Sequence, residues 1–294
     1  MAQLRKASPR QPATAQHEAI TSRDNRWLKR LRSALSGEEH EDGLVGVEGV
    51  RLVEAALGSG LHVEALLLNN SGERHLRRLA PLLSPGVRIL RTTDRLFASI
   101  AGTETPQGVA ALVRPALVTI EDLLRGIPLV IVLVGVQDPG NVGTILRAAE
   151  AFGATGAATC ASGALGTADP LGPKALRASA GSALRLPILR EVTLDILLAG
   201  LRASSLRVYA AVAATNKTPG RVLPTLRPWE IDWKSPSALL IGNEGSGLPE
   251  EIVLAADARV SIPQATAATP IGIESLNAAM AATVLLYEAM RQRI

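Results

Sequence analysis

The amino-acid sequence predicts an α/β protein of two domains, and three observations lead to this prediction. The chain has 294 residues, which is enough for two domains of ordinary size. Hydrophobic residues make up 47% of the chain and charged residues 20%, so it can bury a large core and does not have the composition of a disordered protein. Segments typical of strands alternate with segments typical of helices, as in sheets covered by helices.

The N-terminal segment combines a flexible tail with a basic helix. Residues 1–20 are rich in Ala, Gln and Pro without periodicity, and they predict a flexible, basic tail. From Asn25 to Ala34, hydrophobic residues recur at helical spacing, beginning with Trp27, Leu28 and Leu31, and basic residues lie between them. This pattern predicts an amphipathic helix with a cationic face.

The segment 21–114 is predicted to form the first α/β domain, followed by a linker at 115–127. Short hydrophobic runs alternate with amphipathic stretches in this segment. We expect strands over 44–47, 63–68, 87–90 and 109–113, and helices over 49–57, 71–83 and 93–98.

The second domain, 128–294, opens with the run PLVIVLVGV at 128–136. A continuous run rich in β-branched residues is typical of a strand buried on both faces of a parallel sheet. We expect further strands over 154–159, 206–211, 237–241 and 258–262, and helices over 142–152, 173–183 and 275–291.

The positive charge of the chain is concentrated at its N-terminus. The net charge of the whole chain is +4, whereas residues 1–35 contain eight Lys and Arg against two acidic residues, a net charge of +6. Basic arms often contact nucleic-acid phosphates, although a tail that only aids solubility has the same composition. The seven aromatic residues argue against a binding surface made of stacked Phe and Tyr rings.

Cysteine, histidine and hydropathy exclude several classes. The single Cys160 excludes an intramolecular disulfide and a cysteine-based zinc site, and the four His residues all lie in the first quarter of the chain without ligand spacing, so we expect no metal. We find no signal peptide, and the longest hydrophobic run, 129–136, is far shorter than the roughly 20 residues of a membrane span. We therefore expect a cytoplasmic protein.

Three polar segments follow predicted strands, at the sheet edge where α/β proteins bind ligands. In the first, 137–154, Asn141 is a good helix N-cap, Gly143 permits close approach of another backbone, and Arg147 is a cation on a helix of small apolar residues. A helix N-terminus at this place could hold a phosphate, but a single solvated or paired Arg is equally ordinary.

The second segment, 239–252, contains three glycines in six residues, Gly242, Gly245 and Gly247, which expose backbone N–H groups. It fits neither the P-loop nor the dinucleotide-binding pattern, and it is also compatible with an ordinary tight connection. Glu244 would repel a phosphate, which indicates a ligand with hydroxyl groups or a positive centre.

The third segment, 260–290, places Ser275 and Asn277 at the start of the last predicted helix, where both could simply be capping residues. No histidine follows residue 128, so a Ser-His-Asp triad is excluded from this domain. The remaining Asn, Arg, Glu and Ser side chains would position reactants rather than supply a strong nucleophile.

Taken together and in this order, the three segments resemble the SpoU (TrmH-like) RNA ribose methyltransferases of the SPOUT superfamily. The resemblance covers about 128–294, and weaker similarity at 20–25, 48–57 and 106–111 resembles the ribosomal-protein-like RNA-binding domain that often precedes it. The motifs read Asn141-x-Gly143 with Arg147 and Ala148, then Ile241 to Leu248 (IGNEGSGL), then Ile262-Pro263 with Glu274 to Asn277 (ESLN); Lys174 to Ser179 is similar to a segment of the ribosomal RNA members.

The resemblance implies a deep trefoil knot, bent S-adenosylmethionine as cofactor, a homodimer with the site near the subunit interface, and methyl transfer to a ribose 2′-hydroxyl of RNA. It implies site positions at Asn141, Arg147, Glu244, Ser275 and Asn277. Cofactor contacts are implied at Leu240, Gly242, Asn243, Gly245, Ile262, Pro263, Leu276 and Asn277, and we expect RNA contacts at Arg23, Arg26, Lys29, Arg30, Lys174 and Arg177.

Within this family Arg147 would assist removal of the hydroxyl proton, but a guanidinium scarcely deprotonates, so gripping a phosphate is the role we favour. The sequence departs from the family between Pro263 and Ser275, where the spacing is longer and Gln264 replaces a common Met. The expected substrate is 23S ribosomal RNA, and a self-protecting resistance methylase fits the same pattern. A transfer RNA methyltransferase and a non-catalytic RNA-binding protein of the same fold are the alternatives.

Overall fold

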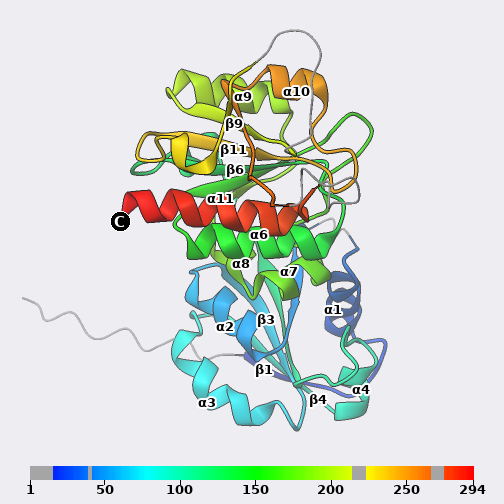
Figure 1. Cartoon of the computed structure of the whole chain (residues 1–294). Helices are drawn as coiled ribbons and strands as arrows, with labels where there is room; N and C mark the ends of the chain where they lie inside the picture. Colours follow the sequence, from blue (N-terminus) through cyan, green and yellow to red (C-terminus); the bar gives the residue numbers. More distant parts are fainter. Residues whose placement is uncertain (1–15, 39–41, 214–222, 266–274) are drawn as a thin grey trace, which may run out of the picture. The chain divides into compact units, whose positions relative to one another are not determined.

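The computed structural model describes residues 16–38, 42–213, 223–265 and 275–294. The chain divides into two compact units, the first ending at Pro115 and the second beginning at Ala116 (Figure 1). In the described part, no helix is both long enough and apolar enough to cross a bilayer.

The first unit is built on a mixed five-stranded sheet in the order β1-β4-β3-β5-β2. The three strands β1, β4 and β3 are parallel, and β5 runs antiparallel to both β3 and β2. The strands are β1 (Gln16–Ile20), β2 (Val45–Glu48), β3 (His62–Leu68), β4 (Arg88–Thr92) and β5 (Val109–Arg114).

Strand β1 corrects the prediction of a flexible tail over 1–20. Residues 16–20 pair with β4 from Gln16 beside Arg88 to Ile20 beside Thr92, and the Thr92 hydroxyl donates a hydrogen bond to the Ile20 carbonyl. Ile20 is buried in the core, and this burial together with strand pairing outweighs the polar composition that predicted a tail. The rest of the predicted tail, 1–15, lies outside the described residues.

The predicted basic helix is α1 (Arg26–Ser36). The Asn25 side chain accepts a hydrogen bond from the Trp27 N–H at its start, and Gly37 ends it in the left-handed conformation at φ 83°. Trp27, Leu28 and Leu31 are buried against strands β3, β4 and β5, as the helical spacing predicted.

The other helices of the first unit are short. The prediction of one helix over 71–83 was wrong, because Pro81 lacks the N–H that a continuous helix needs and 3-10 turns flank a single helical turn. The short helices and turns of this unit are α2 (Val50–Gly58), the 3-10 turn Glu73–His75, α3 (Leu76–Leu79), the 3-10 turn Ala80–Leu82 and α4 (Asp94–Ala98).

The second unit contains a seven-stranded sheet in which every pair is parallel, in the order β10-β12-β9-β11-β6-β7-β8. All six residues of β6 are buried, which confirms the prediction of a strand covered on both faces. The strands are β6 (Leu129–Val134), β7 (Gly156–Cys160), β8 (Ile188–Leu189), β9 (Arg207–Ala211), β10 (Thr225–Leu226), β11 (Ser237–Ile241) and β12 (Ala258–Val260).

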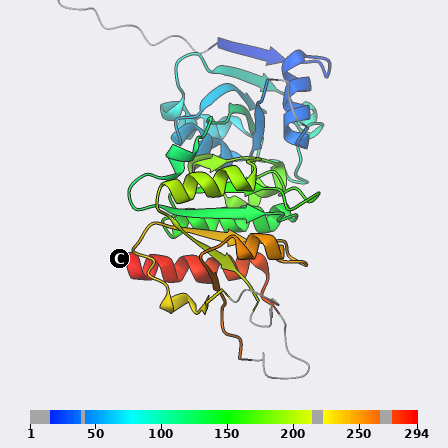
Figure 2. The same ribbon diagram turned by 90° about the horizontal axis from the view of Figure 1, so that it is seen from above.

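Helices cover both faces of this sheet. Figure 1 shows α9 and α10 on one side and α6 and α11 on the other, and Figure 2 shows α9 and α10 from their own side. The helices are α5 (Ile120–Leu123), α6 (Pro139–Ala151), α7 (Pro173–Ser179), α8 (Ser182–Arg185), α9 (Leu194–Ala203), α10 (Glu250–Leu254) and α11 (Ala278–Arg293), with a 3-10 turn at Pro228–Glu230.

Two features differ from the predicted helices and linker. The helix expected over 173–183 breaks into α7 and α8, because Ala180 and Gly181 take left-handed conformations at φ 51° and 88°. Within the segment predicted as a linker, α5 forms, and Leu123 is completely buried in the core of the second unit beside Val130. That segment therefore contributes to packing as well as connecting.

Candidate active site

The first polar segment builds the N-terminus of α6. We predicted a helix beginning after Asn141, but α6 begins at Pro139 and its cap is Asp138, whose carboxylate accepts a hydrogen bond of 2.8 Å from the Gly140 N–H. Proline is well suited to the first helical position, which explains the earlier start. The Lys174 ammonium lies 2.7 Å from Asp138 and, with the Gly140 N–H, lowers the pKa of that carboxyl.

Gly143 lets α6 and α7 pack closely, as the sequence predicted. A Cβ atom at this position would lie 2.3 Å from the Ala175 carbonyl oxygen and 2.7 Å from the Ala178 Cβ. Because the nearest obstacle is backbone, a side chain here would push the two helices apart.

The glycine-rich loop after β11 is held by Asn243. Its amide donates to the Gly135 carbonyl at 2.9 Å, and its side-chain oxygen accepts from the N–H groups of Gly245 and Ser246. Gly242 is needed where the loop folds back, since a Cβ there would lie 2.4 Å from the Gly247 carbonyl carbon. The loop is a rigid cradle rather than a free connection.

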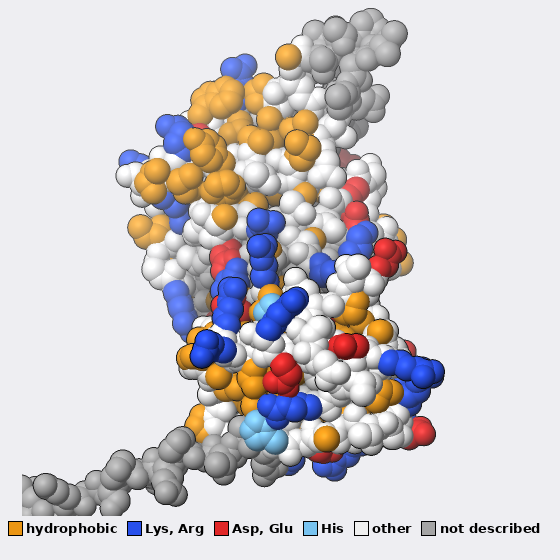
Figure 3. All heavy atoms as spheres, turned by 90° about the horizontal axis from the view of Figure 1, so that it is seen from below, with side chains coloured by type: hydrophobic (Ala, Val, Ile, Leu, Met, Phe, Trp, Pro, Cys, Tyr) orange, Lys and Arg blue, Asp and Glu red, His pale blue; other side chains and the backbone are white. Residues whose placement is uncertain are grey.

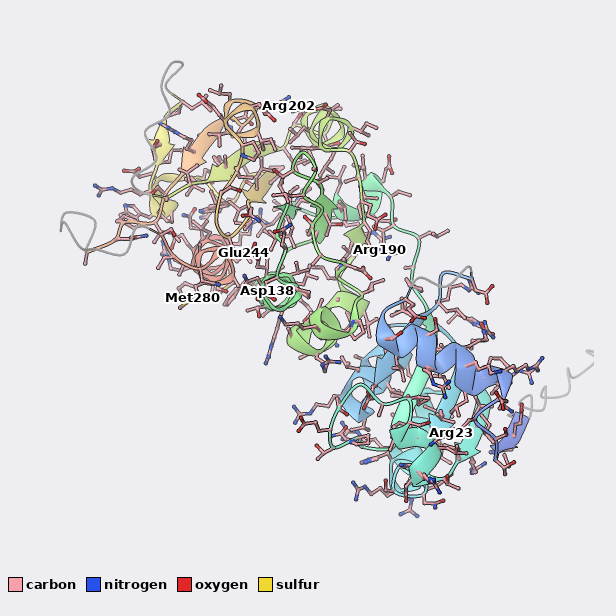
Figure 4. All side chains as sticks on the ribbon, turned by 90° about the vertical axis from the view of Figure 1, so that its right-hand side faces the viewer. Arg23, Asp138, Arg190, Arg202, Glu244 and Met280 are labelled. Carbon is pink, nitrogen blue, oxygen red and sulfur yellow. The ribbon has the colours of Figure 1, made fainter. Side chains whose placement is uncertain are left out.

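Glu244 joins this loop to the start of α6. Its carboxylate accepts hydrogen bonds from the N–H groups of Gln137 (3.1 Å) and Asp138 (3.0 Å) and from the Asn141 amide (2.9 Å). Figure 4 shows Glu244 and Asp138 beside each other. Burial alone would raise the pKa of Glu244, but the hydrogen bonds from Asn141, Asp138 and Gln137 outweigh it, so the pKa lies below its usual value. Glu244 therefore has a structural role, because it ties the glycine-rich loop to the start of α6. The sequence had indicated only that this carboxylate favours a ligand with hydroxyl groups or a positive centre.

Asn277 connects the third segment to the same network. Its side-chain oxygen accepts from the N–H groups of Ala279 and Met280, so it is the N-cap of α11, and its amide donates to the Asn141 oxygen at 3.1 Å. A hydrogen-bonded chain therefore runs from Glu244 through Asn141 to Asn277. It unites the three polar segments, and Asn141 is more than 100 residues away in sequence from both of its partners.

A pocket of about 290 Å³ opens beside this network, at the carboxyl ends of β9, β11 and β12. Its wall combines the glycine-rich loop with hydrophobic side chains and the start of α11. The lining residues are Ala211, Val212, Ala213, Ile241, Gly242, Asn243, Glu244, Gly245, Ser246, Gly247, Leu248, Val260, Ile262, Gln264, Ser275, Leu276, Ala278, Ala281 and Leu285.

The pocket gathers many of the residues that the sequence indicated. From the expected cofactor set it includes Gly242, Asn243, Gly245, Ile262 and Leu276, and from the expected catalytic set it includes Glu244 and Ser275.

Other expected residues lie elsewhere. Leu240 is completely buried in the core of the sheet, and neither Pro263 nor Asn277 is part of the lining that the described residues form. The residues 266–274, most of the cofactor-loop wall whose spacing departs from the family, lie outside the described part of the chain. Sequence reasoning missed the contribution of Ala211 at the end of β9 and of Val212 directly after it, because only the strand order places β9 next to β11.

Arg147 lies on α6 outside the pocket lining. Its side chain is exposed, and no carboxylate of the described residues pairs with it. It is thus available to a ligand that approaches the outer surface of α6.

The residues expected to contact RNA differ in their surroundings. Lys29 pairs with Asp24 at 3.2 Å, Arg30 pairs with Glu64 at 2.7 Å, and Lys174 pairs with Asp138 as described above. Arg23 (labelled in Figure 4), Arg26 and Arg177 are exposed and have no carboxylate partner within the described ranges.

Metal-ligating side chains do not cluster in the described ranges: no group of three His, Cys, Asp or Glu residues there could hold a metal ion. Cys160 is buried at the end of β7, and burial raises the pKa of its thiol to about 12.

Comparison with known proteins agrees with the site. Residues 128–287 match the model of the SpoU rRNA methylase family, and residues 28–111 match the MRM3-like substrate binding domain. The fold is that of an α/β protein whose N-terminal domain has a mixed sheet and whose C-terminal domain has an all-parallel sheet with the site at its edge. The chain belongs to the SpoU rRNA methylase family.

Relatives and solved structures align along nearly the whole chain. A 23S rRNA (uridine(2479)-2′-O)-methyltransferase of Streptomyces viridochromogenes is 35% identical, covering 94% of this chain and 92% of its own. A 23S rRNA (guanosine(2553)-2′-O)-methyltransferase of Bacillus subtilis is 31% identical over 82% of this chain and 86% of its own. The structure of an AdoMet-bound rRNA methyltransferase from Sinorhizobium meliloti is 29% identical, with a TM-score of 0.79 over 95% of this chain and all of that one.

Proposed function

We propose that this protein transfers a methyl group from S-adenosylmethionine to a ribose 2′-hydroxyl of 23S ribosomal RNA. The observation that carries the proposal is the hydrogen-bonded network of Glu244, Asn141 and Asn277 beside the pocket at the sheet edge. The names of the relatives, which act on 23S ribosomal RNA, support the same substrate. For a bacterial 23S ribosomal RNA, the substrate that these relatives name, we propose a cytoplasmic place of action.

The pocket suits S-adenosylmethionine. The glycine-rich loop from Gly242 to Gly247 offers backbone carbonyl groups, and Ile262, Leu276 and Leu285 offer apolar surface for a base. The cofactor supplies a methyl group activated by a sulfonium charge. These residues would hold and orient it, and Ser275, which lines the same pocket, would offer a hydroxyl for a hydrogen bond.

The protein supplies orientation rather than a nucleophile. The Asn141–Glu244 contact fixes the start of α6, the helix that carries Arg147. Arg147, exposed and without a carboxylate partner in the described chain, grips an RNA phosphate and so aligns the adjoining ribose. Holding reactants in line can lower a barrier by several kcal/mol. Lys174 and Arg177 on the neighbouring α7 extend this basic surface for RNA.

The activity is tested by mapping ribose methylation in ribosomal RNA from cells with and without the gene. We expect loss of at least one 2′-O-methyl group in 23S ribosomal RNA. The division of roles is tested with Arg147→Ala, which should abolish methylation of the RNA in vitro and leave calorimetric binding of S-adenosylmethionine nearly intact. Unchanged methylation maps would overturn the function, and equal loss of binding and methylation would overturn the role of Arg147. Methylation confined to transfer RNA would instead favour the transfer RNA alternative.

We also propose that the protein is a homodimer through α11. Three side chains at helical spacing on one side of this helix are exposed hydrophobics, namely Met280 (63% exposed), Val284 (43%) and Tyr287 (51%). Figure 3 shows hydrophobic side chains gathered on one face, and Met280 points away from the sheet in Figure 4. Met280→Asp should shift the mass measured by light scattering from dimer to monomer. The matched control Ile196→Asp changes a similarly exposed residue (61%) on α9 and should leave the dimer intact.

We propose, finally, that the C-terminal part of the second unit is threaded into a trefoil knot, as the family resemblance implies. The support is the return of the chain after β12 to the start of α6, where Asn277 meets Asn141. Pulling a single molecule by its two ends should then give an extended length measurably short of the full contour of about 3.3–3.6 Å per residue. A fully extended chain would contradict the knot.

A further inference from the structure

An arginine cluster surrounds Trp27 in the first unit. The guanidinium carbons of Arg26, Arg30 and Arg88 lie 5.3, 5.0 and 5.5 Å from the centroid of the Trp27 ring, within the range of cation–π attraction. Two of these arginines come from α1, but Arg88 comes from β4, about sixty residues later in the chain. The cluster is therefore a product of the fold.

The three arginines are not equivalent. Arg30 donates to Glu64 at 2.7 Å and to Asp42 at 2.8 Å, so carboxylates compensate its charge. Arg26 and Arg88 meet no carboxylate among the described residues. Arg26 is exposed and Arg88 is half-buried.

Two uncompensated guanidinium groups that converge on one ring repel each other, because the Debye length of about 8 Å at physiological salt screens them only in part. Both guanidinium groups lie over the Trp27 ring, and that residue is itself 4% exposed, so it offers no surface on which a base could stack. What the cluster presents to solvent is N–H donors and positive charge. An oxyanion bound to these guanidinium groups would reduce the repulsion and accept hydrogen bonds from those donors.

The positive charge of the N-terminal segment of this chain also favours an anionic ligand. Gln16 lies beside Arg88 in the pairing of β1 with β4. The fifteen residues that precede Gln16 in the sequence contain Arg5, Lys6 and Arg10 and no acidic residue.

We infer that Arg26 and Arg88, held on Trp27, form a binding site for a backbone phosphate of the RNA substrate. The inference rests on the proposed function for its choice of RNA. The site reads the position of the backbone and not the sequence, because phosphate contacts orient a nucleic acid without distinguishing bases. It places the RNA on the first unit independently of the methyl-transfer pocket.

The test is equilibrium binding of an in vitro transcript of 23S ribosomal RNA to the full-length protein, measured over a series of salt concentrations without cofactor. Arg88→Gln should weaken binding about fivefold or more and reduce the slope of log affinity against log salt by about 1. Arg88→Lys, which keeps the charge but loses the forked N–H donors of the guanidinium group, should restore the slope but only part of the affinity. Circular dichroism and calorimetric binding of S-adenosylmethionine verify that the variants are folded.

The matched control is Arg51→Gln. Arg51 is an exposed arginine on α2 of the same unit, and its substitution makes the same change of charge away from Trp27. Equal losses in the Arg51 and Arg88 variants, or no loss with Arg88→Gln, would overturn the inference. Binding of polyglutamate is measured in parallel. If Arg88→Gln weakened binding of polyglutamate but not of RNA, the cluster would be assigned to an acidic protein partner, and the inference would also be overturned. This experiment measures RNA binding and not methylation. If Arg88→Gln weakened RNA binding but the protein methylated no RNA, the phosphate site would be supported and only the enzymatic proposal would be refuted.

Discussion

Replacing Glu244 by Gln should loosen the junction between the glycine-rich loop and α6. A Gln oxygen can keep the two hydrogen bonds that Oε1 accepts from Asp138 and Asn141, but its NH₂ group then faces the Gln137 N–H that Oε2 accepts in the native protein. The variant therefore loses one hydrogen bond and the charge that strengthens the other two. It also places its own NH₂ group against the Gln137 N–H, so that two donors face each other.

The magnitude follows from these contacts. A buried hydrogen bond to a charged group contributes about 1.5–3 kcal/mol to stability. Because Glu244 is exposed, water replaces much of this contribution, and about 0.5–1 kcal/mol for each hydrogen bond is appropriate. The total loss is about 1–2 kcal/mol. For a unit of this size it should lower the melting temperature by about 3–6 °C.

The pH dependence has a definite sign. The pKa of Glu244 is below its ordinary value in the folded protein, so its stabilising effect is complete above the ordinary value of 4.5 and is lost as the pH falls through the folded pKa. The difference in melting temperature between the native protein and Glu244→Gln should be full near pH 7 and should shrink near pH 4.

The assay is differential scanning calorimetry at several pH values, with Glu250→Gln as the control. Glu250 is exposed in the first turn of α10 and has no hydrogen-bonding partner in the described part of the chain, so its substitution should change the melting temperature little. Equal melting temperatures of the native protein and Glu244→Gln near pH 7 would refute the reasoning, as would a difference that stays the same near pH 4.

Three further outcomes are expected. Gly143→Ala should destabilise the protein by about 2–3 kcal/mol in chemical denaturation, because the new Cβ meets the Ala175 carbonyl, whereas Gly58→Ala, where a Cβ meets nothing within 4 Å, should be neutral or slightly stabilising; equal effects would contradict this account of α6–α7 packing. The native protein should not react with a thiol reagent near pH 8, since burial raises the pKa of Cys160 to about 12, and the unfolded protein should react once per chain; rapid labelling of the native form would be inconsistent with the buried thiol. Deleting residues 1–15, a cut that spares β1, should flatten the salt dependence of RNA binding without changing binding of S-adenosylmethionine, and an unchanged salt slope would exclude a role for that segment in RNA affinity.

Sequence periodicity predicted the elements whose signal is local. The buried strands β6 and β11 and the amphipathic helix α1 lie close to where hydrophobic spacing placed them, because the burial of alternate or successive side chains leaves a direct imprint on the sequence. The same is true of the candidate site in part. Three polar segments after strands predicted a site at one sheet edge, and many of their residues do line the pocket there.

The tertiary structure decided everything that depends on which distant segments meet. Strand order placed Ala211 of β9 in the pocket, and packing turned the polar residues 16–20 into strand β1. Only the fold brings Asn141 within hydrogen-bonding distance of Glu244 and Asn277, and Arg88 over Trp27. The physical reason is that periodicity records which side of an element is buried, whereas the partner across that surface is selected by the packing of the whole chain. The chemistry of this protein could therefore be predicted by residue type, while the contacts that position it required the three-dimensional structure.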